Sequence, residues 1–284
     1  MADYAQLQSL VSTGWLARHL ADPDLKIVDA SYYLPMQNLS ARAEYDARHI
    51  PGAVFFDIDE IADSSSPLPH MLPSPEKFAS RVRKLGLGDG NRIVVYDSQG
   101  LFSAARVWWM FRIFGHKDVA VLDGGLPKWI AEGHPVDDSP PQPRERHFTA
   151  RFDHRQVRDK GQVLVNLDSK REQVLDARSA GRFHAREPEL WPGRRSGHIP
   201  RAHNLPYTDL LDPTAKTLLP ADALAARFRS AGIDLARPVV ASCGSGITAS
   251  VLALGLHLIG HRDVAVYDGS WAEWGLPGDT PVET

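Results

Sequence analysis

The sequence predicts an α/β protein built from two tandem copies of one domain, each a parallel sheet with helices on both faces. Three observations predict this fold class. The chain has 284 residues, about twice the length of a typical domain. Its two halves repeat the same motifs, and in each half short β-branched segments alternate with segments of helical length.

The repeat is clearest in a segment that covers residues 115–125 and returns at residues 260–270. The first copy reads Gly-His-Lys-Asp-Val-Ala-Val-Leu-Asp-Gly-Gly, and the second reads Gly-His-Arg-Asp-Val-Ala-Val-Tyr-Asp-Gly-Ser. Another motif, His-Ile-Pro, begins at His49 and again at His198. Two diverged copies of one domain explain these matches better than two unrelated domains.

The secondary structure of each copy follows from its apolar segments. Residues 93–96 and 119–122 are predicted to be buried strands because they are rich in β-branched side chains, and residues 104–114 have helical length and a wide apolar face. The second copy repeats this order, with a strand at 239–241, a helix at 247–259 and a strand at 264–267. This spacing implies parallel strands joined by right-handed crossovers.

A linker is predicted at residues 137–146, which are rich in proline and charge and have no apolar period. We therefore expect a first domain at 1–136 and a second domain at 147–284.

Composition indicates an ordinary folded protein, with 43% hydrophobic and 24% charged residues. The formal net charge of −3 predicts no broad cationic surface for nucleic acid. The longest apolar stretch, residues 247–260, is too short to span a bilayer, and the first residues lack the pattern of a secretory signal. We expect a cytoplasmic protein with no nucleic-acid or membrane partner.

The single cysteine, Cys243, excludes an intramolecular disulfide and a cysteine-based metal cluster. It lies between a predicted strand and a predicted helix, where parallel α/β sheets place their sites. Gly244 and Gly246 allow a tight turn whose backbone N–H groups converge on the sulfur, and a helix N-terminus favours an anion there. This polar, glycine-rich setting favours chemistry over the packing role that is usual for a free cysteine.

The first copy indicates which half of the chain is catalytic, and two other classes of cysteine enzyme fit the sequence less well. At the offset of the 115–125 repeat, Cys243 aligns with Ser98, so only the second half is expected to be catalytic. A cysteine phosphatase needs an arginine six positions after its nucleophile, where this chain has Ala249. A papain-type hydrolase uses a Cys–His pair on a different architecture.

Several motifs together carry a resemblance to a known family. They are Val-Ser-Thr-Gly-Trp at 11–15, His-Ile-Pro-Gly-Ala at 49–53, Arg-Val-Trp-Trp at 106–109 and Leu-Asp-Gly-Gly at 122–125. With them, the chain resembles the tandem-domain rhodanese family over nearly its whole length. Its loop from Cys243 to Ala249 is similar to that of 3-mercaptopyruvate sulfurtransferases, whereas thiosulfate sulfurtransferases usually carry basic residues directly after the cysteine.

The resemblance implies a two-step sulfur transfer. The Cys243 thiolate takes sulfur from 3-mercaptopyruvate, releases pyruvate and becomes a persulfide, which then passes its outer sulfur to cyanide, glutathione or another thiol, or thioredoxin. The amides of the loop and the hydroxyls of Ser245 and Thr248 are expected to hold the persulfide. Substrate contacts are also expected from Gly244, Gly246 and Ile247. The reaction implies no metal and no organic cofactor.

The resemblance also implies an arginine for the substrate carboxylate, and Arg182 matches that position. The family's second arginine would lie nine positions further on, where this chain has Trp191. Two interpretations stay open: either Arg186, Arg194 or Arg195 reaches the same carboxylate, or Trp191 changes the donor selectivity.

In the first copy, Asp59 and His70 match the acidic residue and the histidine that face the cysteine across the domain interface in the family. A histidine there could stabilise the thiolate or protonate the departing enolate, and the aspartate could orient it. Residues that recur in both halves, such as Asp123 and Asp268, are expected to serve folding, because one of these halves lacks the cysteine.

Two other functions stay open on sequence alone. One is a thiosulfate sulfurtransferase. The other is a persulfide carrier that receives sulfur from a desulfurase and passes it to a partner protein. Trp191 and Arg201, which replaces the glycine of the first copy, keep the carrier in consideration.

Overall fold

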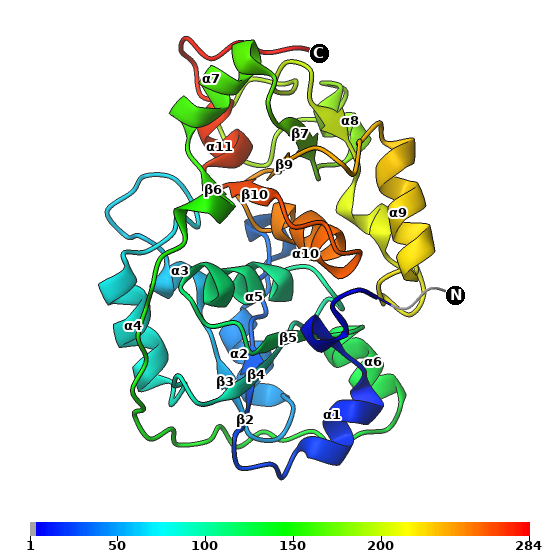
Figure 1. Cartoon of the computed structure of the whole chain (residues 1–284). Helices are drawn as coiled ribbons and strands as arrows, with labels where there is room; N and C mark the ends of the chain where they lie inside the picture. The colour runs from blue at the N-terminus through cyan, green and yellow to red at the C-terminus, as the bar shows by residue number, and fades with distance from the viewer. Residues whose placement is uncertain (1–3) are drawn as a thin grey trace.

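A computed structural model describes residues 4–284 and contains two α/β domains in succession. Residues 1–3 of the predicted first domain lie outside the described residues. Each domain has a five-stranded parallel sheet, and the strand orders β1-β5-β4-β2-β3 and β6-β10-β9-β7-β8 are equivalent. In Figure 1 the first domain, blue to green, lies below the second, which runs from green through yellow to red. The predicted fold class is confirmed.

The first domain alternates strands and helices from its first sheet strand onward. Its strands are β1 (Leu10–Val11), β2 (Leu25–Asp29), β3 (Ala53–Phe55), β4 (Arg92–Tyr96) and β5 (Val119–Leu122). Its helices are α1 (Thr13–His19), α2 (Ala41–Ala47), α3 (Ile58–Ile61), α4 (Pro75–Lys84), α5 (Ala104–Ile113) and α6 (Gly125–Ala131). Short 3-10 helices lie at Leu7–Ser9 and Pro35–Gln37.

The second domain follows the same plan. Its strands are β6 (Val157–Arg158), β7 (Gln173–Asp176), β8 (His203–Asn204), β9 (Val239–Ser242) and β10 (Val264–Tyr267). Its helices are α7 (Lys160–Ser169), α8 (Ala180–Phe183), α9 (Ala221–Ser230), α10 (Ala249–Leu258) and α11 (Ser270–Trp274). Short 3-10 helices lie at His154–Gln156 and Tyr207–Leu210.

Local sequence explains where several helices begin. Ser12, Ser40 and Ser74 each accept a hydrogen bond from a backbone N–H of the first turn of α1, α2 and α4. Asp159 forms a capping box with Gln162 at α7. The helix predicted at 247–259 begins later, at Ala249, because residues 243–248 curl into a loop instead.

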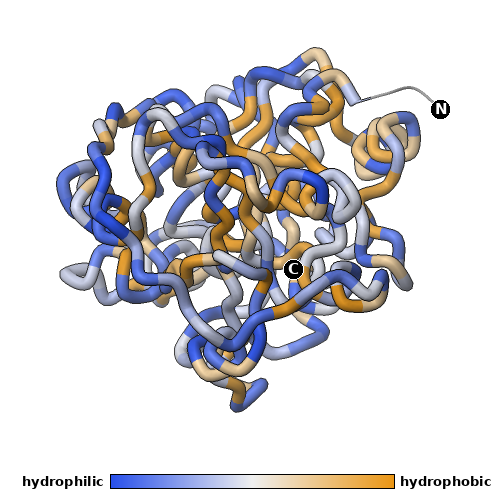
Figure 2. Tube along the Cα trace, turned by 90° about the horizontal axis from the view of Figure 1, so that it is seen from below, coloured by the Kyte–Doolittle hydropathy of each residue, from blue (hydrophilic) through white to orange (hydrophobic). Residues whose placement is uncertain are grey.

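Helices cover both faces of each sheet, and apolar side chains fill the space between. In the first domain, α1 and α6 bury Leu16 and Trp129 on one face, while α4 and α5 cover the other. In the second domain, Val163 of α7 and Trp271 of α11 lie on one face, with α9 and α10 on the other. Figure 2 shows the hydrophobic segments gathered inside and hydrophilic loops around them.

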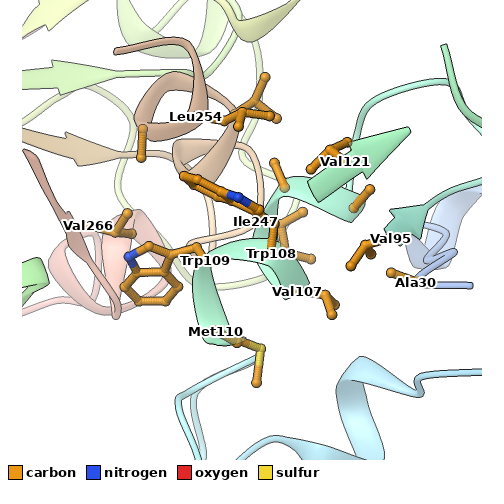
Figure 3. Packing of buried hydrophobic residues seen from close by; sticks show 14 of the residues in the cluster. Ala30, Val95, Val107, Trp108, Trp109, Met110, Val121, Ile247, Leu254 and Val266 are labelled. Atoms are coloured by element: carbon orange, nitrogen blue, oxygen red, sulfur yellow. The ribbon is translucent and has the colours of Figure 1, made fainter. Parts of the chain in front are cut away.

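The two domains meet where α5 packs against α10. One continuous hydrophobic cluster contains residues of both helices and runs through both domains. Figure 3 shows the indole side chains of Trp108 and Trp109, from α5, among second-domain side chains that include Leu254 and Val266. Since each domain buries apolar surface against the other, their relative position is fixed by a shared core.

The segment that packs on the first domain extends beyond the end of the predicted linker at residue 146. Phe148 is fully buried, and its ring lies 5.7 Å from that of Phe78 and 6.1 Å from that of Phe111. Residues 148–152 therefore pack with the first domain, although we predicted that the second begins at residue 147. The N-terminal segment does the reverse, since the Tyr4 hydroxyl donates to Leu219 O at 2.7 Å.

A search of the helices within residues 4–284 finds no segment long and apolar enough to cross a membrane.

Candidate functional site

The loop that carries Cys243 follows the central strand β9 directly, at the carboxyl edge of the second sheet. The cysteine is buried, with 2% of its surface exposed. The backbone N–H of Gly246 donates to its Sγ at 3.1 Å, and its own N–H donates to Ser270 Oγ at 3.1 Å. The loop therefore turns back on the sulfur and directs an amide at it.

Glycine is required at position 246 for two reasons. Its φ of +82° lies in the left-handed region, and a Cβ there would lie 2.8 Å from Arg106 Nη1 and 3.0 Å from Asp268 O. The turn that directs the Gly246 amide at the sulfur thus depends on the absence of a side chain.

Arg106 reaches this loop from α5 of the first domain. Its guanidinium is fully buried and donates to Asp268 Oδ1 at 2.7 Å, to His70 O at 2.6 Å and to Gly246 O at 3.5 Å. It thereby fastens the histidine loop of one domain to the cysteine loop of the other. Sequence analysis singled out Arg106 only as part of the Arg-Val-Trp-Trp motif. Its isolation in a long apolar helix is the signal that it has a distant partner.

His70 lies against the cysteine loop, across the domain interface. Its Nδ1 is 2.8 Å from Ser245 Oγ, and its Nε2 is 3.3 Å from Asp59 Oδ1. The His70 side chain is 1% exposed, whereas that of Asp59 is 64% exposed. The Tyr32 ring packs edge-on against the imidazole, with the centroids 4.8 Å apart. An imidazole thus connects a solvent-facing carboxylate with the hydroxyl of Ser245 in the cysteine loop.

Arg182 lies over the other side of the loop. Its Nη2 is 3.2 Å from the position that a Cβ on Gly244 would take, and it donates to Glu189 Oε2 at 2.5 Å. Glu189 also accepts from Arg178, whose Nη1 lies 2.6 Å from Oε1. The Glu189 side chain is 3% exposed, so its carboxylate is buried between two guanidinium groups.

Arg178 is a further cation near the sulfur that the sequence did not suggest. Burial opposes its charge, but Asp176 and Glu189 raise the pKa of Arg178 above its ordinary value, and Cys243 adds to this effect. Its guanidinium also lies 4.3 Å from the centroid of the Trp271 ring. Neither Glu189 nor Arg178 stands in a motif with a spacing that would have identified it.

Trp191 takes part in the site at the place where the second family arginine was expected. Its Nε1 lies 3.8 Å from the position of a Cβ on Gly244, and its ring packs edge-on against His70 with the centroids 5.7 Å apart. The indole therefore covers the loop between the histidine and Arg182.

The remaining residues that were predicted to contact the substrate lie in several different environments. Arg195 donates to Thr280 O and Trp274 O, and it thereby fastens the C-terminal segment. A contact between Arg195 and the substrate stays a prediction. Arg194 donates to the carbonyls of Ala272 and Pro192, behind the loop. Ile247 is buried, Thr248 is partly buried at the start of α10, and Arg186 is exposed.

The alignment of Cys243 with Ser98 is also wrong. Register in the sheets pairs Asp29 with Tyr96 and Asp176 with Ser242, so the residue after each strand is Asp97 in one domain and Cys243 in the other. The Asp97 carboxylate is fully buried and accepts from four backbone N–H groups of its own loop, namely those of Gln99, Phe102, Ser103 and Ala104. The first domain thus has a loop whose amides bind an anion, and that anion is the Asp97 carboxylate of the loop itself.

Taken as chemistry, the site combines a thiol nucleophile, an amide directed at its sulfur, a guanidinium, and an imidazole that joins a hydroxyl to a carboxylate. Such a set suits transfer of a group that carries negative charge. Within residues 4–284, no group of three or more His, Cys, Asp or Glu side chains is arranged to hold a metal ion.

Comparison with known proteins agrees with this arrangement. The family model of the rhodanese-like domain matches residues 12–132 and 159–276. The chain is 45% identical to the 3-mercaptopyruvate sulfurtransferase of Homo sapiens, over 96% of this chain and 94% of that protein. It is also 45% identical to the thiosulfate sulfurtransferase of Cricetulus griseus, over 94% of this chain and 92% of that protein.

Structural similarity extends over the same length. The crystal structure of SseA, a 3-mercaptopyruvate sulfotransferase from Escherichia coli, superimposes with a TM-score of 0.85 at 42% identity, covering 93% of this chain and 99% of that one. Two matched domains, a shared strand order and full-length similarity lead to one conclusion: this chain belongs to the rhodanese family of sulfurtransferases, among its members with two tandem domains.

Proposed function

We propose that this protein is a 3-mercaptopyruvate sulfurtransferase that carries sulfur as a persulfide on Cys243. The observation that carries the proposal is the environment of Gly244, the residue directly after the nucleophile. It bears no charge itself, and one guanidinium, that of Arg182, lies over it. One cationic donor suits the single carboxylate of mercaptopyruvate better than the dianion thiosulfate.

In the first step, the Cys243 thiolate attacks the thiol sulfur of the donor. A sulfur–sulfur bond forms, the carbon–sulfur bond breaks, and its electron pair stays on carbon as the enolate of pyruvate. This enolate then takes a proton. The hydrogen bond from the Gly246 amide to Sγ supports stabilisation of a sulfur anion at this position.

We assign the proton transfer to the Asp59, His70 and Ser245 chain. Ser245 lies two residues after Cys243 in the loop, and the His70 Nδ1 is 2.8 Å from the serine hydroxyl. A proton that leaves the hydroxyl for the enolate can be replaced from the imidazole, which the exposed Asp59 carboxylate orients.

In the second step, an external acceptor attacks the outer sulfur and regenerates the thiolate. The chain has one cysteine, so no second thiol can resolve the persulfide internally. We propose a small thiol such as glutathione, cyanide or reduced thioredoxin as acceptor. The partly buried Trp191, beside Gly244, covers the loop where the family's second arginine would stand.

Kinetics with both donors test the proposal. We expect a higher kcat/KM with 3-mercaptopyruvate than with thiosulfate, each measured with cyanide as acceptor. A higher kcat/KM with thiosulfate would instead identify a thiosulfate sulfurtransferase.

Mass spectrometry separates the enzyme from a carrier. Incubation with mercaptopyruvate should add one sulfur atom to the wild type, not to Cys243→Ser, and thioredoxin should remove it. No adduct on the wild type without a partner protein would favour a persulfide carrier.

A further inference from the structure

We propose that a cavity between the two domains, separate from the Cys243 loop, binds a small multivalent anion. The cavity measures about 760 Å³ and is lined by residues of α5 and by the segment from His257 to Ala265 of the second domain. No residue of the 243–248 loop lines it. Its volume is in the range of known small-molecule sites.

The first observation is an arginine whose guanidinium has no hydrogen-bond acceptor or ion-pair partner among the described residues. Arg112 of α5 lines the cavity, and its guanidinium forms no hydrogen bond or ion pair with any of the described residues 4–284. Its guanidinium lies 5.1 Å from the centroid of the Trp108 ring. Burial lowers the pKa of Arg112, which means that its charge lacks compensation. A partly buried guanidinium without an acceptor is unfavourable unless a ligand supplies one.

Two further polar atoms at the cavity also lack partners. The Trp108 Nε1 and the His261 Nε2 are buried and have no hydrogen-bond partner among the residues described. Both residues line the cavity. Trp108 is 2% exposed, so its indole N–H has no contact with bulk water. Buried donors and acceptors are normally satisfied, so these two atoms and the Arg112 guanidinium offer a ligand in the cavity three polar contacts.

The charges of the lining show that this ligand is an anion. Acidic lining residues Asp153 and Glu172 are already paired, with Arg155 at 2.9 Å and with Arg158 at 2.6 Å. The remaining charged residues of the lining are Arg112, Lys117, Arg262 and Asp263. Three cations therefore face one carboxylate, and the lining has a net positive charge before any histidine is counted.

The donors define what the anion must accept. Arg112 offers a planar fork of N–H groups, and Trp108 offers a single N–H, which together suit the oxygens of a phosphate or carboxylate group. His261 would join them in its protonated form, which an adjacent anion favours. Burial lowers the pKa of both His257 and His261 in the unliganded protein, so neither histidine supplies the positive charge alone.

Calorimetric titration with inorganic pyrophosphate tests the proposal. The wild type should bind this probe, and Arg112→Gln should weaken the affinity at least about tenfold, because a charge-assisted donor is lost. Arg229→Gln, on the exposed side of α9, removes the same charge elsewhere and should bind like the wild type.

The active site is itself suited to anions, so a third variant separates the two sites. Arg182→Gln should leave pyrophosphate binding unchanged. The indole signal of Trp108, identified as the one missing from Trp108→Phe, should shift on titration. Absence of binding at millimolar pyrophosphate, equal affinity in Arg112→Gln, or loss of binding in Arg182→Gln alone would overturn the proposal.

Discussion

Arg182 shows how much of a residue's role lies in its neighbours. Its guanidinium is held by the buried Glu189, and two of its nitrogens, Nε and Nη2, are already engaged by that carboxylate. The remaining nitrogen, Nη1, lies 3.8 Å from the position of a Cβ on Gly244 and has no described partner. Glu189 thus orients the fork, and one N–H edge is left for a substrate carboxylate.

We predict that Arg182→Ala raises the KM for 3-mercaptopyruvate by about tenfold or more. The reason is that a hydrogen bond between charged groups contributes about 1.5–3 kcal/mol. Initial-rate kinetics at saturating acceptor give the KM, with Arg229→Ala as the control. An unchanged KM in Arg182→Ala would assign this arginine to the support of Glu189 alone.

At the scale of an element, the loops after β4 and β9 occupy equivalent positions in the two sheets and carry different side chains at their first residue. In one, four amides surround the Asp97 carboxylate, and in the other an amide meets the Cys243 sulfur. In the first domain, the Asp97 carboxylate accepts the hydrogen bonds of the loop amides. In the second domain, we propose that a persulfide on Cys243 accepts them. This explains why the first domain can keep the loop without the chemistry.

We predict that Asp97→Ala lowers the free energy of unfolding by about 3 kcal/mol or more, because it leaves several buried N–H groups without an acceptor. Urea denaturation measures the change.

Ser98→Ala, one residue further on, removes only a hydroxyl that donates to the Tyr33 hydroxyl at 2.8 Å. It should leave turnover nearly unchanged, and a large loss of activity there would contradict the assignment of catalysis to the second domain.

Helix α10 contributes a pH dependence of stability through His257. Burial, helped by the nearby Arg112, lowers the pKa of His257 to about 4. The unfolded chain binds a proton near pH 6.5, whereas the folded protein does so only near pH 4. The stability is therefore full above pH 6.5 and is lost as the pH falls from 6.5 through 4.

Between pH 7 and pH 4, we predict that the free energy of unfolding falls by up to about 3 kcal/mol less in His257→Gln than in the wild type. Urea midpoints measured across the range give the slope for both proteins. Parallel slopes for the wild type and His257→Gln would show that other groups, such as the neighbouring His261, carry the dependence.

At the scale of the whole molecule, the active site exists only when the two domains are docked. Cys243 and its loop come from the second domain, while His70 and Arg106, which contact this loop, come from the first. Arg106 and Asp268 form a buried ion pair at 2.7 Å, and the other oxygen of Asp268 accepts from the Leu72 N–H at 2.8 Å. This pair joins the histidine loop, the cysteine loop and α5.

We predict that Arg106→Met destabilises the protein by about 3–5 kcal/mol, because Asp268 is left buried without its partner. Asp268→Asn and the double variant complete a thermodynamic cycle, and we expect a coupling energy above about 1 kcal/mol. Additive losses would mean that the two residues act independently. The kcat should also fall in Arg106→Met, because this variant loses the link between the histidine loop and the cysteine loop. Arg182 and its contact with the Glu189 carboxylate are unchanged in this variant.

The sequence alone predicted several of the elements and the residue proposed as nucleophile. Strands such as β5 and β10 begin and end where β-branched runs predict, and the repeat established two copies of one domain. Cys243 was identified from a local pattern, a strand followed by a glycine-rich turn. The cytoplasmic location and the identity of the sulfur acceptor stay predictions.

Only the tertiary structure decided which residues surround that nucleophile. The Arg106–Asp268 pair, the placement of Arg195 at the C-terminal segment and the burial of Phe148 in the first domain join residues far apart in the chain. The equivalence of Asp97 with Cys243 required the register of the sheets. Hydrophobic periodicity and turn residues report on neighbours within one element, whereas these contacts depend on how two domains bury apolar surface against each other.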